Sequence, residues 1–467
     1  MTMITFATSY MNLHSMNYHF IAIGGAVMHN LAIALHQKGH TISGSDDEIF
    51  DPAKSRLQVL GLLPEMVGWF PDKIHPGLDA VLVGMHARKE NPELSRAIEL
   101  GIKIFSFPEF LYEHARNKKR VVVGGSHGKT TITAMIMHVL RHCGKDFDYL
   151  VGAQLEGFDV MVKISDTAPI MVYEGDEYLA APFDPRPKFH LYHPHIALIS
   201  GIAWDHINVF PDFDEYVEQF RLFVGMIEPG GSFVYNQEDS LVTGIAMQAR
   251  KDIVLIPYTT PEYGAVEGVN SLSIDGTQVP LQIFGRHNMQ NLAGAMQVCI
   301  ELGVAKNQFL DAIKTFSGAA RRLELLSSTT GTLVFKDFAH SPSKLKASVN
   351  AVKEQYPESN LVACMELHTF SSLSKDFLQL YSDCMEKADV AIVYFNPHAI
   401  ALKKLSPINA SDVQKAFRKK GLMVYSDSQQ LIADLLNRSW KNTNLLMMSS
   451  GDFDGTDLTV LAAKITG

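Results

Sequence analysis

Residues 120–131, with the sequence RVVVGGSHGKTT, decide how the middle of this chain folds. Val121, Val122 and Val123 predict a buried strand, which runs into two glycines and then into an amphipathic helix. A glycine-rich turn between a strand and a helix lets backbone N–H groups surround phosphate oxygens. The stretch therefore predicts a phosphate-binding loop, and the alternative is an ordinary glycine turn.

Two residues of this loop suit parts of a bound nucleotide. Lys129 would reach the outer phosphates, and the Thr130 hydroxyl would lie on Mg²⁺. The loop is a shorter variant of the strict Walker pattern, because Val123 stands where that pattern has its first glycine. The apolar spacing of residues 132–140 predicts a helix packed on the core, and Gly144 is a suitable residue to end it.

The composition is that of a globular protein. The chain has 467 residues, of which 46% are hydrophobic and 19% charged, and its net charge of −9 argues against non-specific nucleic-acid binding. Its four cysteines lack CxxC spacing, so we expect reduced thiols, as in the cytoplasm. No apolar run approaches about 18 residues, so we expect no membrane span. Residues 1–16 contain no Lys or Arg, and we expect a loose extension rather than a signal peptide.

The N-terminal region predicts a parallel sheet with a second phosphate-binding turn. Residues 18–23, 41–43 and 80–83 read as strands, and a helix follows Gly24 and Gly25. Of the three glycines in the dinucleotide-binding pattern GxGxxG, only the first is present, as Gly24. Ser45 and Asp46 end the second strand, and Asp46 lies about 20 residues beyond the turn, where an acidic group binds a sugar hydroxyl. The alternative for Asp46 is a polar turn residue.

Beyond the phosphate loop, two further predicted strands end in polar side chains. Residues 170–173 lead into Glu174, and residues 196–200 lead to His206. Ligands of doubly wound sheets bind at the carboxyl ends of parallel strands, so one site can hold Lys129 with both of these residues. A carboxylate facing phosphates suits Mg²⁺, which prefers oxygen ligands. His206 is a candidate ligand of a second Mg²⁺ or an orienting group.

Composition shifts divide the chain into three α/β domains. A short basic link at residues 117–120 and the stretch 318–322 predict boundaries. Strands near residues 333–335, 361–364, 390–394 and 445–448 alternate with helical stretches in the last part. We expect a Rossmann-like N-terminal domain (1–116), a central P-loop ATPase domain (117–322) and a Rossmann-like C-terminal domain (323–467).

Six motifs in this order resemble those of the Mur ligase family, the ATP-dependent amide ligases of peptidoglycan assembly. They are GSHGKTT (125–131), EGDE (174–177), DH (205–206), GRHNMQN (285–291), RRLE (321–324) and DFAHSP (337–342), which are similar to that family's GT(H/N)GKT(T/S), EADE, DH, GxHNxxN, RR(F/L)E and D(Y/F)AHxP. The resemblance covers nearly the whole chain from about residue 18.

The resemblance implies ATP and Mg²⁺ as cofactors and assigns roles to particular residues. The implied catalytic residues are Lys129, Glu174 and His206, and the implied metal ligands are Thr130, Glu174 and His206. The implied nucleotide-binding residues are Gly125, Ser126, His127, Gly128, Lys129, Thr130, Thr131, His287, Asn288, Asn291, Arg321 and Asp337. The implied substrate-binding residues are Gly24, Gly25, Ser45, Asp46 and His340.

Residues 174–189 and 205–210 are most similar to the members that join L-alanyl-γ-D-glutamyl-meso-diaminopimelate to UDP-N-acetylmuramate in cell-wall recycling. Ala203, Lys336 and His368 depart from the pattern of those members. The implied partners are UDP-N-acetylmuramate and a cell-wall peptide, with no nucleic acid and no membrane, and we expect a cytoplasmic monomer or weak homodimer. The alternatives are a UDP-N-acetylmuramate–L-alanine ligase, a plain NTPase and a non-catalytic nucleotide-binding paralogue.

Overall fold

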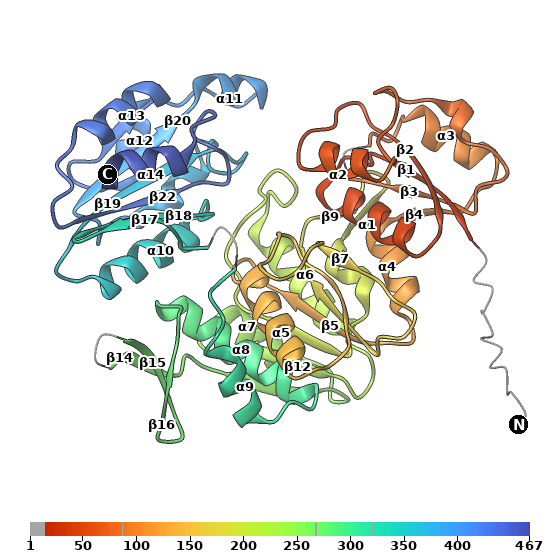
Figure 1. Ribbon diagram of the computed structural model, residues 1–467, viewed down its shortest axis with the longest axis horizontal. Helices are drawn as coiled ribbons and strands as arrows, with labels where there is room; N and C mark the ends of the chain where they lie inside the picture. The colour runs from red at the N-terminus through yellow and green to blue at the C-terminus, as the bar shows by residue number, and fades with distance from the viewer. Residues whose placement is uncertain (1–14, 86, 267–268, 320–321) are drawn as a thin grey trace, which may run out of the picture. The chain divides into compact units, whose positions relative to one another are not determined.

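The computed structural model describes residues 15–85, 87–266, 269–319 and 322–467, and these form two compact units (Figure 1). The first unit contains the described residues up to Arg116, together with Val162–Asp166 and Leu179–Arg186. The second unit contains Asn117–Met161, Thr167–Tyr178 and Pro187–Gly467. Within the part of the chain that the structure describes, no helix has the length and apolar character needed to cross a lipid bilayer.

The first unit is built on a parallel sheet with the strand order β2-β1-β3-β4. Its strands are β1 (Asn17–Ile21), β2 (Thr41–Ser45), β3 (Ala80–Val83) and β4 (Ile104–Ser106). Its helices are α1 (Ala26–Gln37), α2 (Ala53–Val59), η1 (Pro71–Lys73), α3 (Pro92–Glu99) and α4 (Phe107–Ala115). The two later segments of this unit add β7 (Val162–Lys163), β9 (Leu179–Ala181) and β10 (Asp184–Pro187). The three strands predicted here are confirmed.

The second unit begins with a parallel sheet that carries the strands in the order β13-β12-β11-β5-β8-β6. These strands are β5 (Lys119–Gly124), β6 (Asp148–Leu150), β8 (Ile170–Glu174), β11 (Ile196–Ile199), β12 (Ser232–Asn236) and β13 (Val254–Tyr258). The register pairs Val123 with Glu174 and Gly124 with Ile199. The carboxyl ends of three neighbouring strands therefore meet at one edge of the sheet.

Helices and a small antiparallel sheet complete this part of the chain. The helices are α5 (Lys129–His142), η2 (Lys188–Tyr192), α6 (Phe213–Gly225), α7 (Ser240–Met247), α8 (Arg286–Glu301) and α9 (Lys306–Ile313). The antiparallel strands are β14 (Glu262–Val266), β15 (Val269–Ile274) and β16 (Thr277–Pro280). The predicted helix after the loop is confirmed as α5, and Gly144 follows it with a φ of +64°.

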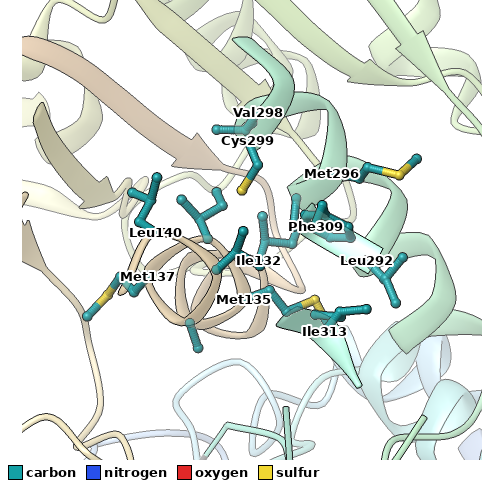
Figure 2. Close-up of a cluster of buried hydrophobic side chains, with 14 of the residues drawn as sticks. Ile132, Met135, Met137, Leu140, Leu292, Met296, Val298, Cys299, Phe309 and Ile313 are labelled. Atoms are coloured by element: carbon teal, nitrogen blue, oxygen red, sulfur yellow. The ribbon is translucent and has the colours of Figure 1, made fainter. Parts of the chain in front are cut away.

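The core of this region forms where α5 packs against α8 and α9 (Figure 2). Ile132, Met135 and Leu140 of α5 are fully buried, as are Leu292 of α8 and Phe309 of α9. The apolar stripe predicted from the sequence of α5 is therefore core packing. Because the phosphate loop precedes α5 directly, this core fixes the position of the loop.

The last part of the second unit holds a sheet with the strand order β17-β18-β22-β19-β20-β21, in which only β17 is antiparallel. Its strands are β17 (Glu324–Thr329), β18 (Thr332–Asp337), β19 (Asn360–Leu367), β20 (Val390–Phe395), β21 (Met423–Tyr425) and β22 (Thr443–Met448). Its helices are α10 (Pro342–Gln355), η3 (Phe377–Tyr381), α11 (Pro397–Leu402), α12 (Ala410–Phe417), α13 (Ser428–Asn437) and α14 (Leu458–Thr466).

Two apolar clusters cover the faces of this last sheet. The four strands predicted here correspond to β18, β19, β20 and β22. The two edge strands were not predicted, because β17 is polar and largely exposed and β21 has only three residues. The chain thus has the three-domain α/β architecture expected from its sequence, while the boundaries at residues 116 and 322 remain predictions.

We expect Leu292→Ala to destabilise the second unit, because the side chain is fully buried between α8 and α5. Loss of a buried leucine costs about 2–5 kcal/mol of unfolding free energy. Thermal unfolding should show the difference as a lower melting temperature, and Met247→Ala is the control because Met247 is 81% exposed. Equal melting temperatures for the two variants would contradict this account of the core.

Candidate functional site

The loop between β5 and α5 can be built only with glycine at two positions. Gly125 and Gly128 have φ values of +128° and +77°, which side-chain-bearing residues rarely adopt. A Cβ atom on Gly125 would lie 2.1 Å from Ser200 Oγ, and one on Gly128 would lie 2.3 Å from Asn291 Oδ1. The strand, turn and helix predicted for a phosphate loop are therefore present, with the N-terminus of α5 opening at Gly128.

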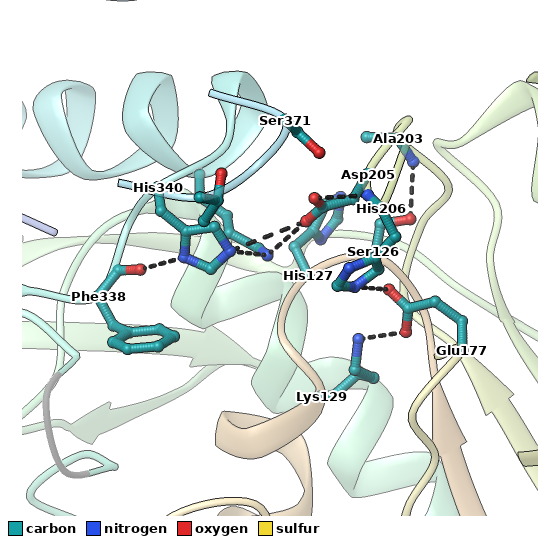
Figure 3. Close-up of polar contacts among 12 residues, drawn as sticks. Ser126, His127, Lys129, Glu177, Ala203, Asp205, His206, Phe338, His340 and Ser371 are labelled. Atoms are coloured by element: carbon teal, nitrogen blue, oxygen red, sulfur yellow. Dashed lines mark hydrogen bonds and ion pairs between the residues drawn. The ribbon is translucent and has the colours of Figure 1, made fainter. Parts of the chain in front are cut away.

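Lys129 is held inside this loop by an ion pair (Figure 3). Its Nζ donates to Gly125 O at 2.7 Å and to Glu177 Oε2 at 2.5 Å. Burial alone would lower the pKa of Lys129, but the neighbouring carboxylates of Glu177 and Asp176 outweigh it and raise that pKa. Burial would likewise raise the pKa of Glu177, but the charge of Lys129 outweighs it and the pKa is lowered to about 2. Both partners are thus charged at neutral pH.

Glu174, the last residue of β8, faces the first turn of α5. Its carboxylate accepts from Thr130 Oγ1 at 2.8 Å and from Gly152 N at 2.7 Å. Among the described residues, no group of three or more His, Cys, Asp and Glu side chains is arranged to hold a metal ion. Two adjacent oxygen donors beside a phosphate loop do fit Mg²⁺, which keeps several waters and takes further ligands from phosphates.

His206 lies on the other side of Glu177, with its Nε2 3.6 Å from Glu177 Oε1. Burial would lower the pKa of His206, but the ion pair with Glu177 and the charge of Asp205 raise it. Glu177 therefore forms ion pairs with both Lys129 and His206, and a hydrogen bond from Thr130 connects Glu174 to the loop. The structure brings the three predicted catalytic residues to one sheet edge, through a carboxylate that was not among the predicted site residues.

Ser126 and Ala203 connect the loop to the segment that carries His206. Ser126 Oγ lies 2.8 Å from Tyr216 OH and accepts from Ala203 N at 3.0 Å, as Figure 3 shows for the second contact. Tyr216 OH also donates to Glu177 Oε1 at 3.2 Å. Because Ala203 contributes through its backbone, the departure from the family pattern at this position leaves that contact in place.

Asp205 and His340 approach each other from different sheets (Figure 3). His340 Nε2 lies 3.8 Å from Asp205 Oδ2, and Lys344 Nζ lies 3.3 Å from the same oxygen. Burial would raise the pKa of Asp205, but Lys344 and His206 keep it well below its usual range. Sequence reasoning missed Lys344, and its only signal was a basic residue in the first turn of a helix after the DFAHSP motif.

A cavity of about 380 Å³ opens beside the loop and gathers most of the predicted nucleotide-binding residues. The predicted residues that line it are His127, Gly128, Thr131, His287, Asn288, Asn291 and Asp337. Residues of the lining that were not predicted include Arg286, Gln290, Arg322, Lys344, Lys346 and Glu354. The predicted Arg321 lies outside the described residues. A cavity rimmed by lysine, arginine and histidine side chains suits a phosphorylated ligand.

In the first unit, the predicted substrate-binding residues lie around the turn between β1 and α1. Gly25 precedes α1, and Gly24 N donates to Asp46 Oδ2 at 2.7 Å. Ser45 Oγ accepts from Lys73 Nζ at 3.1 Å. Burial raises the pKa of Asp46. Asp46 thus fills the turn-residue role considered as the alternative, and its contact with a sugar stays a prediction.

Models of one protein family match three successive parts of the chain. The model described as Mur ligase family, catalytic domain, matches residues 17–119, and the Mur ligase middle domain matches residues 123–299. The model described as Mur ligase, glutamate ligase domain, matches residues 321–451.

Relatives of two kinds are about equally similar to the chain. A UDP-N-acetylmuramate–L-alanine ligase of Caldicellulosiruptor saccharolyticus is 29% identical over 450 residues, which cover 93% of this chain and 96% of that protein. A UDP-N-acetylmuramate–L-alanyl-γ-D-glutamyl-meso-2,6-diaminoheptandioate ligase of Escherichia coli K12 is 26% identical over 455 residues, which cover 94% and 96%.

Solved structures show the same fold. A murein peptide ligase of Psychrobacter arcticus superposes with a TM-score of 0.67 and 23% identity, covering 97% of this chain and 99% of that one. A UDP-N-acetylmuramate–alanine ligase of Thermotoga maritima superposes with a TM-score of 0.70 and 20% identity, covering 96% and 98%.

We expect His127 to make the protein less stable as the pH falls from about 6.5 to about 4. Burial, with Lys344 as the next cause, lowers the pKa of His127 to about 4, whereas an unfolded histidine titrates near 6.5. Between these values the unfolded state binds more protons, so the free energy of unfolding decreases with falling pH.

Melting temperatures measured from pH 7 to pH 4.5 test this expectation. The His127→Gln variant should lose less stability over that range than the parent, since glutamine binds no proton. His398→Gln, which removes an exposed histidine, is the control and should follow the parent. Parallel curves for the parent and His127→Gln would show that His127 has the same pKa in the folded and the unfolded state, which would contradict the expectation.

Proposed function

The chain belongs to the Mur ligase family of ATP-dependent amide ligases, and we propose that it joins the carboxylate of UDP-N-acetylmuramate to the amine of a cell-wall peptide. The observation that carries this proposal is the phosphate loop, whose Lys129 and Thr130 face the carboxylates of Glu177 and Glu174 beside a cavity rimmed by cations. We propose L-alanyl-γ-D-glutamyl-meso-diaminopimelate as the peptide and peptidoglycan recycling as the process.

The choice of a peptide acceptor is supported by sequence similarity alone. Relatives named for the tripeptide acceptor and for L-alanine differ by only a few percent in identity to this chain. The segments 174–189 and 205–210 favour the tripeptide, as their sequences resemble the peptide-adding members. A UDP-N-acetylmuramate–L-alanine ligase is therefore the second candidate, favoured by the slightly higher identity.

The proposed reaction proceeds in two balanced steps. The sugar carboxylate attacks the γ-phosphorus of ATP, the bond to the bridging oxygen breaks, and ADP leaves. The amine nitrogen then attacks the acyl carbon, the carbon–oxygen bond to phosphate breaks, and the nitrogen loses a proton. Since phosphorylation supplies the leaving group, the protein has to position the reactants and neutralise charge.

The residues of the loop and the cavity fit these tasks. Lys129 would exchange Glu177 for the transferring phosphoryl group, and the N–H groups of Gly125, His127 and Gly128 would bind phosphate oxygens, while Ser126 N donates to Gly201 O. Thr130 and Glu174 would hold Mg²⁺, which neutralises phosphate charge when bound. His206 is proposed as a further ligand, which requires it to give up its proton and its pairing with Glu177.

The remaining assignments follow the domains. We propose that residues 1–116 bind the UDP-sugar through Gly24, Gly25, Ser45 and Asp46. Residues 117–322 would bind ATP, with His287, Asn288, Asn291 and Thr131 lining its cavity and Asp337 completing it. Residues 323–467 would bind the acceptor, with His340 close by. A cytoplasmic monomer or weak homodimer is proposed as the working state.

Glu174→Gln should raise the Mg²⁺ concentration needed for half-maximal ligation. A neutral amide is a poorer ligand for a hard cation, and we expect an increase on the order of tenfold or more. Initial rates over a Mg²⁺ titration give the value, and Glu218→Gln serves as a control because the Glu218 side chain of α6 is 40% exposed and pairs with Arg221. An unchanged titration curve would assign Glu174 a purely structural role.

An acceptor panel tests the proposed function directly. With ATP, Mg²⁺ and UDP-N-acetylmuramate present, we expect ADP release and ligation with the tripeptide but not with L-alanine alone. Dipeptide and tetrapeptide complete the panel, and Lys129→Ala is the inactive control, with an expected loss of about 10²–10³ in rate.

The other results of the panel would each favour a different function. Exclusive use of L-alanine would identify the alternative ligase. ATP hydrolysis that ignores the UDP-sugar would indicate a plain NTPase, and binding without any product would indicate a non-catalytic paralogue.

A further inference from the structure

Two lysines of the last domain line the nucleotide cavity, Lys344 and Lys346, and Lys344 is ion-paired with the buried Asp205. Lys344 lies in the first turn of α10, and its side chain lines the cavity together with His127, Gly128 and Thr131 of the phosphate loop. Its side chain is only 20% exposed. Neither the phosphate-loop motif nor the proposed mechanism uses it, although its ammonium group lies beside the residues that do.

The contacts of Lys344 hold its ammonium at this position. Its Nζ donates to Asp205 Oδ2 at 3.3 Å and to His340 Nε2 at 3.4 Å. His340 Nδ1 lies 2.8 Å from Phe338 O, and since a carbonyl only accepts, Nδ1 carries the proton and Nε2 is free to accept. The described contacts thus use two of the three N–H groups of the ammonium.

Lys344 lines the same cavity as His127 and Gly128, which directly precede Lys129 in the phosphate loop. Burial lowers the pKa of Lys344, and among the nearby charges Asp205 raises that pKa while Lys129 lowers it; both lysines also act on His127. Each lysine rests on a buried carboxylate, Lys129 on Glu177 and Lys344 on Asp205. Bringing like charges together in a buried cavity is unfavourable unless an anion lies between them.

We propose that Lys344 is a second phosphate-binding lysine, which contacts the γ-phosphoryl group of ATP opposite Lys129 as that group is transferred. In this arrangement both lysines exchange their carboxylates for phosphate oxygens when ATP binds. The last domain thereby adds a positive charge to the phosphate site of the central domain, and Asp205 and His340 are positioning residues for it. The inference rests on the proposed ATP-dependent ligation.

The affinities for ATP and ADP provide a test that needs neither the sugar nor the acceptor. A lysine that contacts the γ-phosphate contributes to ATP binding and not to ADP binding. We expect Lys344→Met to weaken ATP by about tenfold to a hundredfold, as expected for a lost charge-assisted hydrogen bond, and to leave ADP unchanged. Lys344→Arg should restore most of the difference, because the charge returns.

Titration calorimetry of the parent, Lys344→Met and Lys344→Arg gives these affinities, and the unchanged ADP affinity reports that the variants fold. Lys415→Met, which removes an exposed lysine of α12, is the matched control and should behave as the parent. Equal loss of ATP and ADP affinity, or no loss of either, would overturn the proposal.

A second measurement places Lys344 at one of the two chemical steps. Positional isotope exchange in ATP, measured with UDP-N-acetylmuramate and without an acceptor, reports formation of the acyl phosphate. We expect Lys344→Met to slow the exchange by about 10²–10³. Normal exchange with lost ligation would show that Lys344 acts on the acceptor amine and would overturn the proposal. Absence of exchange in the parent would overturn the proposed sugar substrate, while the ATP and ADP affinities still decide the role of Lys344.

Discussion

The ion pair between Lys129 and Glu177 is the interaction around which the site of this protein is organised. Glu177 is nearly fully buried, and it holds Lys129 with one oxygen while its other oxygen faces Tyr216 and His206. A charge buried without a partner would be costly, so the pair keeps both groups ionised and the loop in place. A phosphate that replaces Glu177 as the partner of Lys129 leaves that carboxylate with Tyr216, whose hydroxyl donates to it at 3.2 Å.

Much of this arrangement could be predicted from the sequence, because its signals are local. The strand–glycine–helix pattern at residues 120–142 gave β5, the loop and α5, and alternating apolar segments gave the parallel strands on either side. Glu174 and His206 could be placed at one sheet edge since parallel strands share their carboxyl ends. The boundaries of β8 and β18 were off by one or two residues, because hydrogen bonding extends strands past their apolar centres.

The parts that sequence reasoning missed depend on contacts between distant residues. Glu177 stands in the quoted EGDE motif, but only the fold shows that it, rather than Glu174, pairs with Lys129. Lys344 is 139 residues away from Asp205 in the chain, and no local pattern links the two. Asp46 shows the opposite case. Its spacing from the glycine turn fits both a turn residue and a sugar ligand. In the structure its carboxylate accepts a hydrogen bond from Gly24 N, as the turn-residue alternative requires.

The close approach of Gly128 to the side chain of Asn291 also constrains how this protein can diverge. The amide of Asn291 occupies the space that any side chain at position 128 would need, although Gly128 precedes α5 and Asn291 lies in α8. Neither position can therefore accept a larger residue independently of the other. We therefore expect the loop and the GRHNMQN segment to change together, and an exchange of α8 between distant homologues would have to carry the loop with it.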